Sequence, residues 1–183
     1  MDESTRTSLN NIRSEDKNLQ NEAYYAVLEA TNIPVDWAYE VWGEMLVGLT
    51  DKDNHVRAIT AQVLCNLAKS DPEKRMLRDF STLLAVTRDE RFVTARHCLQ
   101  ALWKVGIAGA QQQKLLVEGL EGRFRDCITE KNCTLIRYDI IQSLRNVYDV
   151  IVDETVRDRA LALIETEVDL KYRKKYASAW RMK

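Results

Sequence analysis

Apolar residues recur at helical spacing along most of the chain, and this periodicity constrains the fold more than any other feature. Residues 36–49 show the i, i+3, i+4, i+7 spacing of an amphipathic helix at Trp42, Met45, Leu46 and Leu49. No stretch shows the period-two alternation of a half-buried strand. Six Gly and two Pro among 183 residues supply few of the residues that turns require. The sequence therefore predicts an all-α protein.

Short polar or Gly- and Pro-containing breaks divide the periodic pattern. They lie at Pro34 and at residues 50–53, 70–72, 88–89 and 106–109. These breaks, with others nearer the C-terminus, leave nine expected helices, of which eight form four consecutive pairs.

The second helices of these pairs resemble one another. Three segments align without gaps: AQVLCNL at residues 61–67, LQALWKV at 99–105 and IQSLRNV at 141–147. Their shared leucines, Leu64, Leu102 and Leu144, are 38 and 42 residues apart, and a weaker copy has Trp180 at this position. Stacked helix pairs repeat at about 40–47 residues, so the spacing predicts a repeat protein.

One copy carries a recognisable family pattern. The stretch LTDKDNHVRAITAQVLCNLAKSDP at residues 49–72 resembles a HEAT repeat, with the pattern D-x-D-x-x-V-R and a later Leu at Asp51, Asp53, Val56, Arg57 and Leu64. The resemblance implies an all-α superhelix, a HEAT-like solenoid of about four to five helix pairs. It also implies that loop acids and helix arginines form a structural ladder between repeats. The expected ladder residues are Asp53, Arg57, Arg137, Asp169 and Arg173.

Composition suggests how this solenoid is organised within the chain. Residues 1–13 are polar and are expected to be flexible, and residues 14–183 are expected to form a single HEAT-like domain. The N-terminus has no apolar core of the kind that a signal peptide needs, and no segment is apolar enough to span a membrane, so we expect a cytoplasmic location. The four Cys form no C-x-x-C pair, which favours packed thiols.

The sequence contains no recognisable catalytic or cofactor-binding motif. His55 and His97 are its only histidines. His97 and Cys98 are adjacent on an expected helix, so their side chains point about 100° apart and do not form a nucleophile–base pair. Gly-rich phosphate loops and metal-ligand clusters are also absent. We therefore predict no catalytic residue, no cofactor and no metal, and a protein that is not an enzyme.

A candidate binding face follows from the repeat alignment. If Val56, Val63 and Leu64 face the core, the opposite side of each second helix lines the concave side of a HEAT-like solenoid. The corresponding positions are Gln62, Arg96, Gln100, Trp103, Tyr138, Gln142, Arg145, Lys174 and Arg181. Arg, Trp and Tyr often dominate binding energy at interfaces. The alternative is that the same residues are ordinary packing or solvated positions.

Two functions remain open at this stage. The first is a non-enzymatic scaffold that binds a protein or peptide on the concave face. The second is a DNA-binding protein resembling the HEAT-like alkylpurine DNA glycosylases, for which Trp103, Tyr138 and Asp139 are the candidate residues.

Charge does not decide between these two functions. The net charge is −1, yet residues 1–54 hold 11 acids and four bases, and residues 171–183 hold six bases and no acid. The basic segment suits either a capping helix or a nucleic-acid contact. The identity of the partner, the oligomeric state and membership of a larger assembly stay open.

Overall fold

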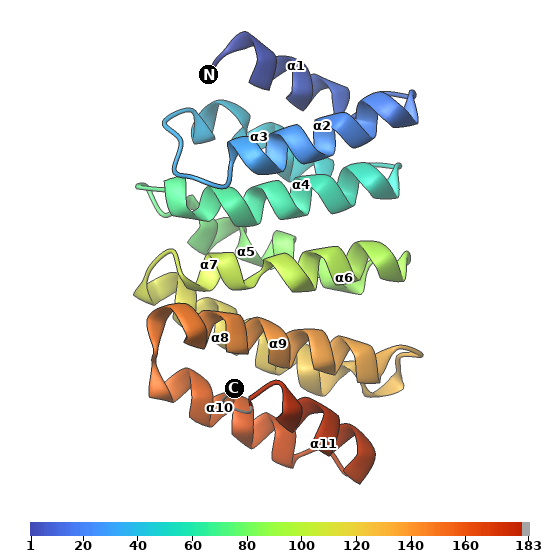
Figure 1. Cartoon of the computed structure of the whole chain (residues 1–183), viewed down its shortest axis with the longest axis vertical. Helices are drawn as coiled ribbons and strands as arrows, with labels where there is room; N and C mark the ends of the chain where they lie inside the picture. Colours follow the sequence, from blue (N-terminus) through green and yellow to red (C-terminus); the bar gives the residue numbers. More distant parts are fainter. Residues whose placement is uncertain (181–183) are drawn as a thin grey trace. The chain divides into compact units, whose positions relative to one another are not determined.

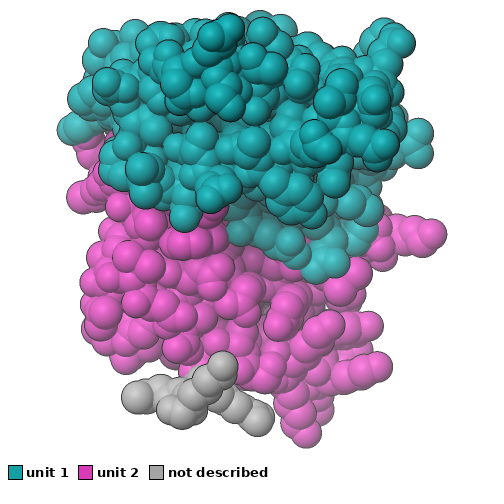
Figure 2. Space-filling view, turned by 45° about the horizontal axis from the view of Figure 1, so that its top comes forward, with its two compact units in different colours: residues 1–101 teal, residues 102–183 magenta. Residues whose placement is uncertain are grey.

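The chain is all-helical in a computed structural model that describes residues 1–180, and it divides into two compact units. Unit 1 covers Met1–Ala101 and unit 2 covers residues from Leu102 onward (Figure 2). The expectation of a single HEAT-like domain over residues 14–183 stays a prediction. Between the expected breaks at residues 88–89 and 106–109 the structure has two helices, α6, which ends at Ala101, and α7, which begins at Trp103.

Unit 1 is built from two layers of helices. Its helices are α1 (Glu3–Asn11), α2 (Lys17–Ala30), α3 (Ala38–Gly48), α4 (Asn54–Leu67), α5 (Arg75–Ala85) and α6 (Phe92–Ala101), with short 3-10 turns η1 (Ala68–Ser70) and η2 (Val86–Arg88). Helix α4 packs between α2 and α6, and these three lie side by side in Figure 1. Helix α3 packs on both α4 and α5 in the second layer, and α1 packs on α2.

Unit 2 is arranged around one long helix. Its helices are α7 (Trp103–Gly106), α8 (Ala110–Asp126), α9 (Cys133–Ile151), α10 (Glu154–Glu165) and α11 (Leu170–Ser178), with the 3-10 turn η3 (Cys127–Thr129) after α8. Helix α9 contacts α7, α8, α10 and α11. The ring of Tyr176 on α11 packs edge-on against Phe124 of α8, with centroids 6.3 Å apart.

Aspartates begin several of these helices. The carboxylates of Asp16, Asp53, Asp153 and Asp169 each accept a hydrogen bond from a backbone N–H two residues later. Such a cap satisfies one of the amides that the first turn of a helix leaves without a partner. The polar breaks in the sequence therefore contain the residues that start the next helix.

The aligned repeat positions lie in the cores of the two units. Leu64, Leu102 and Leu144 each have 0% of their surface exposed. Leu64 belongs to unit 1 and the other two to unit 2. Apolar burial at these positions stabilises the packing of helix on helix, because each amphipathic helix must bury its apolar side against a neighbour.

The N-terminal segment differs from the expectation of a flexible tail over residues 1–13. The structure has helix α1 there, capped by Asp2, and it buries Leu9 and Ile12 at 1% and 0% exposure. Arg6 also donates hydrogen bonds to Glu44 of α3 at 3.0 and 3.2 Å. Two apolar residues on one side of a short helix are enough to attach it, although the segment is otherwise polar.

Candidate functional site: a groove across α2, α4 and α6

An open groove of about 740 Å³ crosses the layer formed by α2, α4 and α6 in unit 1. Three helices contribute side chains to it, all from their N-terminal and middle turns. The lining residues are Lys17, Asn18, Gln20, Asn21, Tyr24 and Tyr25 of α2, Asn54, His55, Ala58, Ile59 and Gln62 of α4, and Val93, Thr94 and His97 of α6. The lining thus combines carboxamide, aromatic and imidazole groups with small apolar surfaces.

Helix α2 provides the aromatic side of the groove. Ala23 and Val27 are buried against the rest of unit 1, at 2% and 0% exposure, which turns Tyr24 and Tyr25 toward the groove. The two rings meet edge to face with centroids 4.9 Å apart. The Tyr24 hydroxyl donates to Gln62 Oε1 at 3.3 Å. Burial raises the pKa of Tyr24, partly offset by this hydrogen bond, so its hydroxyl stays protonated at neutral pH.

Helix α4 forms the floor. Ala58 and Ile59 are 8% and 5% exposed, and they provide a small apolar surface at the middle of the groove. Gln62 is held in place from its own helix, because its Nε2 donates to the Ala58 carbonyl at 3.0 Å. With its oxygen accepting from Tyr24, the Gln62 carboxamide is oriented before any ligand binds.

Helix α6 contributes the opposite wall. Val93 is 64% exposed in the groove, and Thr94 Oγ1 donates to the Asn54 carbonyl at 3.1 Å. His97 is half-buried, and no hydrogen bond joins its ring to another residue within the part of the chain that the structure describes. Burial, and then the nearby positive charge of Arg96, lower the pKa of His97. The imidazole is therefore neutral at pH 7, with one donor and one acceptor nitrogen.

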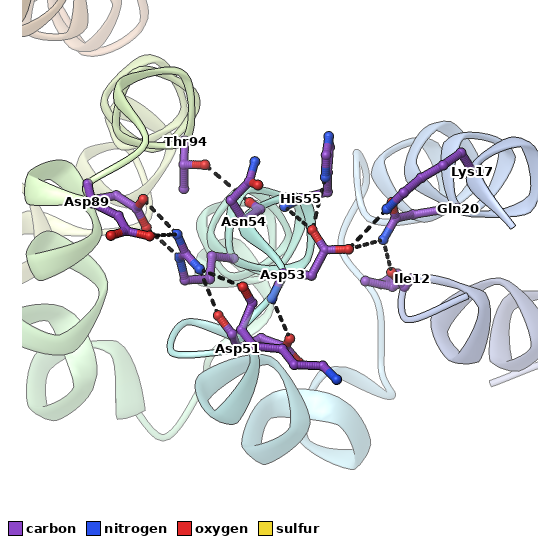
Figure 3. Close-up of polar contacts among 12 residues, drawn as sticks. Ile12, Lys17, Gln20, Asp51, Asp53, Asn54, His55, Asp89 and Thr94 are labelled. Atoms are coloured by element: carbon purple, nitrogen blue, oxygen red, sulfur yellow. Dashed lines mark hydrogen bonds and ion pairs between the residues drawn. The ribbon is translucent and has the colours of Figure 1, made fainter. Parts of the chain in front are cut away.

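Asp53 organises one end of the groove. Figure 3 shows its carboxylate between α2 and the first turn of α4. One oxygen accepts from the backbone N–H of His55 and lies 2.9 Å from its Nδ1, and the other accepts from Lys17 at 3.1 Å and Gln20 at 3.3 Å. Burial raises the pKa of Asp53, but the hydrogen bonds from His55, Lys17 and Gln20 outweigh it and hold the pKa well below its usual value.

A second ion pair fixes α4 to the loop before α6. Arg57 Nε and Nη2 donate to the two carboxylate oxygens of Asp89 at 2.5 and 2.8 Å, and Nη1 donates to the Asp51 carbonyl at 2.8 Å. The side chains of Arg57 and Asp89 are 11% and 6% exposed. Lys17–Asp53 and Arg57–Asp89 therefore each join a base on one helix to an acid in the loop before the next parallel helix (Figure 3).

The expected ladder residues lie at or near the starts of helices, and the hydrogen-bond partners of their side chains are other residues. Asp53 accepts a hydrogen bond from Lys17 of α2, whereas Arg57 donates to Asp89 in the loop before α6. In unit 2, Arg137 donates to Glu167 at 2.8 Å. Asp169 caps α11, and Arg173 donates to the Glu167 carbonyl at 2.7 Å.

The residues of the expected concave face are distributed over both units. In unit 1, Gln62 lines the groove, Arg96 is half-buried near the Phe92 ring, and Gln100 is exposed. The remaining described members belong to unit 2 and are Trp103, Tyr138, Gln142, Arg145 and Lys174. Arg181 lies outside the described residues.

Three of the unit 2 residues are engaged with side chains of their own unit. The ammonium group of Lys175 lies 5.0 Å from the Tyr138 ring centroid. Arg145 Nε donates to Asp149 at 2.5 Å, and its guanidinium lies 5.6 Å from the Trp180 ring centroid. Gln142 donates to Asn146 at 2.9 Å. These contacts order the side chains within unit 2.

The expected site includes no residue from the α2 side of the groove. The repeat alignment begins at α4 and so leaves out Asn21, Tyr24 and Tyr25. A signal for them exists in the sequence, because Tyr24 lies 38 residues before Gln62, and Gln62 lies 38 residues before Gln100. Extending the alignment by one period would have placed α2 in the same series as α4.

Three of the four cysteines are buried. They are Cys65, Cys98 and Cys127, whereas Cys133 is half-buried. Burial raises the pKa of Cys98, and burial together with a hydrogen bond to the Cys133 side chain raises the pKa of Cys127 to about 12. Within residues 1–180, no group of three or more His, Cys, Asp or Glu side chains is placed to hold a metal ion.

Comparison with known proteins adds no family to this description. Neither a family model nor a curated protein matches the chain. Among the described residues, none of the helices combines the length and the apolar character that crossing a bilayer requires.

Proposed function

We propose that the chain is a non-enzymatic interaction scaffold that binds a protein or peptide segment in the groove across α2, α4 and α6. We also propose that its helix pairs are HEAT-like repeats of a short solenoid. The ion pairs Lys17–Asp53 and Arg57–Asp89 support this, because each joins one helix of the α2–α4–α6 layer to the loop that starts the next. Solenoids of this kind use such extended surfaces for binding.

The observation that carries the proposal is a set of carboxamides facing the groove. Among the described residues, no hydrogen bond engages the side chains of Asn18, Asn21 or Asn54. A carboxamide offers both donors and an acceptor, which match the N–H and C=O of a peptide group. Beside them, exposed Tyr25 and Val93 provide surface for apolar side chains, at 63% and 64% exposure. This combination suits an extended polypeptide.

The buried thiols support a binding role over covalent catalysis. A nucleophilic cysteine needs a lowered pKa and access to substrate. Cys98, which follows His97, is 0% exposed, contacts the Leu83 carbonyl at 3.5 Å and has a raised pKa. Its surroundings therefore favour a packed thiol.

The DNA-binding alternative receives less support from the structure. Its candidate acid, Asp139, is 3% exposed on α9. The groove in unit 1 is lined by one lysine and no arginine, whereas binding to phosphates requires several bases. We therefore expect no binding to duplex DNA at low salt, and salt-sensitive binding would favour the alternative.

The proposal is tested by quantitative co-purification from a cell extract with two sets of variants. The groove variant is Asn21→Ala/Tyr25→Ala/Asn54→Ala, and the control is Gln142→Ala/Lys174→Ala in unit 2. We expect at least one protein that binds directly in a purified system to be lost with the groove variant and retained with the control. The proposal is wrong if the control abolishes binding while the groove variant retains it, with both variants showing wild-type thermal unfolding.

A further inference from the structure

Apart from the two tyrosines, the ionisable residues that line the groove are all bases. They are Lys17, His55 and His97, and no Asp or Glu is among the lining residues. Arg96 lies directly before His97 on α6, and its positive charge contributes to lowering the pKa of His97. The groove thus has a positive or neutral lining within a unit whose first 54 residues are strongly acidic.

The carboxylates near the groove are already engaged. Both oxygens of Asp53 accept hydrogen bonds from Lys17, Gln20 and His55, and its side chain is 29% exposed. Asp89 is held by Arg57 on one side and accepts from the Arg91 backbone N–H on the other. These acids therefore neutralise neighbouring bases and present little acceptor capacity to a ligand.

The wall formed by α6 is where a ligand's charge would matter most. His97 has a half-buried ring with no internal partner among the described residues, and Arg96 lies next to it on the same helix. A carboxylate placed beside them would accept a charge-assisted hydrogen bond from the imidazolium in a partly desolvated site, where such bonds are strongest. An ammonium group at the same place would meet His97 and, across the groove, Lys17, and it would feel the positive charge of Arg96 that already acts on His97.

We propose that the segment bound in this groove is an extended peptide with a carboxylate side chain positioned against His97. This inference rests on the proposed function and specifies the chemistry of the partner. The carboxamides of α2 and α4 bind the peptide backbone, the Tyr24–Tyr25 pair and Val93 contact its apolar side chains, and His97 selects the acidic residue.

The same arrangement makes binding depend on pH. Burial and Arg96 keep His97 neutral in the free protein, and a bound carboxylate favours its protonated form. The charged or titratable groups on the elements around it include Asp53, His55 and Arg57 on and before α4, Lys17, Tyr24 and Tyr25 on α2, Arg88 on η2 and Asp89 before α6. Because complex formation takes up a proton, affinity for an acidic peptide should rise as pH falls from about 8 to about 6.

Fluorescence anisotropy with degenerate peptide pools tests the inference. Three labelled pools of equal length have a fixed central Glu, Gln or Lys, and a labelled single-stranded oligonucleotide serves as a fourth probe. The Glu pool should bind about five- to tenfold more tightly than the Gln pool, the margin expected for a charge-assisted over a neutral hydrogen bond. The Lys pool should bind most weakly, and the Glu preference should grow at lower pH.

Different failures separate the two proposals. Equal binding of the Glu and Gln pools, or preference for Lys, would overturn the acidic partner and leave the peptide groove in place. Absence of binding by every pool, or stronger binding of the oligonucleotide, would overturn both.

A charge-removing variant with a matched control locates the effect. His97→Gln should abolish the preference for Glu over Gln and its pH dependence. Arg78→Gln removes an exposed base of α5 outside the groove and should change neither property. If His97→Gln retains the Glu preference, the carboxylate does not bind at His97 and the inference fails.

Discussion

Arg57 shows how one side chain connects several loops of unit 1. It binds both oxygens of Asp89 and the Asp51 carbonyl, and little of it is exposed. Removing a buried guanidinium leaves the partner carboxylate without its counter-charge, and that loss costs more than the pair itself contributes.

Substitution of Arg57 is therefore expected to destabilise the protein strongly. Arg57→Ala should lower the free energy of unfolding by about 3 kcal/mol, the low end for breaking a buried ion pair. Arg157→Ala, which breaks an exposed pair within unit 2, is the control and should have almost no effect. Urea unfolding followed by circular dichroism measures both, and equal effects of the two variants would contradict the structural role of Arg57.

Asp53 predicts how stability responds to acid. Because its pKa is lower in the folded protein than in the unfolded chain, its contribution is fully present above the unfolded value of about 4 and is lost as pH falls below it. Asp53→Asn retains a capping side chain but removes the charge that binds Lys17. The variant should be less stable than the wild type at pH 7, and the difference should shrink as pH is lowered below about 4. A constant difference across the pH range would show that charge is not the cause.

For single residues, the sequence predicts which side chains have a structural role better than it predicts their hydrogen-bond partners. The pattern at Asp53 and Arg57 indicated structural residues, but it did not reveal that Arg57 binds Asp89, 32 residues away. An arginine reaches any of several nearby carboxylates, so its partner depends on how the helices pack. For His97, the sequence shows only its neighbour Cys98. Its place in the groove depends on how α2 and α4 pack beside α6.

Among the elements, the pairing of α3 with α4 depends on a close approach at one glycine. A Cβ atom at Gly48 would lie 2.4 Å from Thr60 Cγ2, and Thr60 is fully buried on α4. Gly43 in the same helix has nothing within 4 Å of its Cβ position and is exposed. The two glycines of α3 thus provide a matched comparison of packing and helix propensity.

Alanine at these two positions should have opposite effects on stability. Gly48→Ala should destabilise by about 1–3 kcal/mol because it forces α3 and α4 apart. Gly43→Ala should stabilise by up to about 1 kcal/mol through helix propensity alone. Thermal unfolding of the two variants measures the sign of each change in stability. Stabilisation by Gly48→Ala would contradict the close approach of α3 to α4 at this glycine.

The sequence predicted most elements because helical periodicity and aspartate caps are local signals. Helix α4, for example, begins after Asp53 and buries Val56, Val63 and Leu64 as expected. Helix α1 was missed because only Leu9 and Ile12 mark its buried side. The groove was predicted only at Gln62, since its α2 wall depends on which helix packs beside α4, and that is a property of tertiary structure.

At the scale of the whole molecule, the two units divide the residues of the expected binding face between them. Unit 1 contains the groove with its carboxamides and histidines, and unit 2 contains Tyr138, Gln142 and Arg145 in contacts within that unit. Peptide binding is therefore assigned to unit 1, and substitutions at exposed residues of unit 2 should leave peptide affinity unchanged.

The central claim is that the groove across α2, α4 and α6 binds peptide, and the side-chain amide resonances of the protein test it most directly. Full-length protein labelled with ¹⁵N is titrated with the Glu peptide pool and observed by ¹H–¹⁵N correlation spectroscopy. We predict saturable shifts of the side-chain amides of Asn18, Asn21 and Asn54, with those of Gln142 and Asn146 in unit 2 unchanged. Shifts confined to Gln142 and Asn146, with the three groove asparagines unchanged, would contradict the claim.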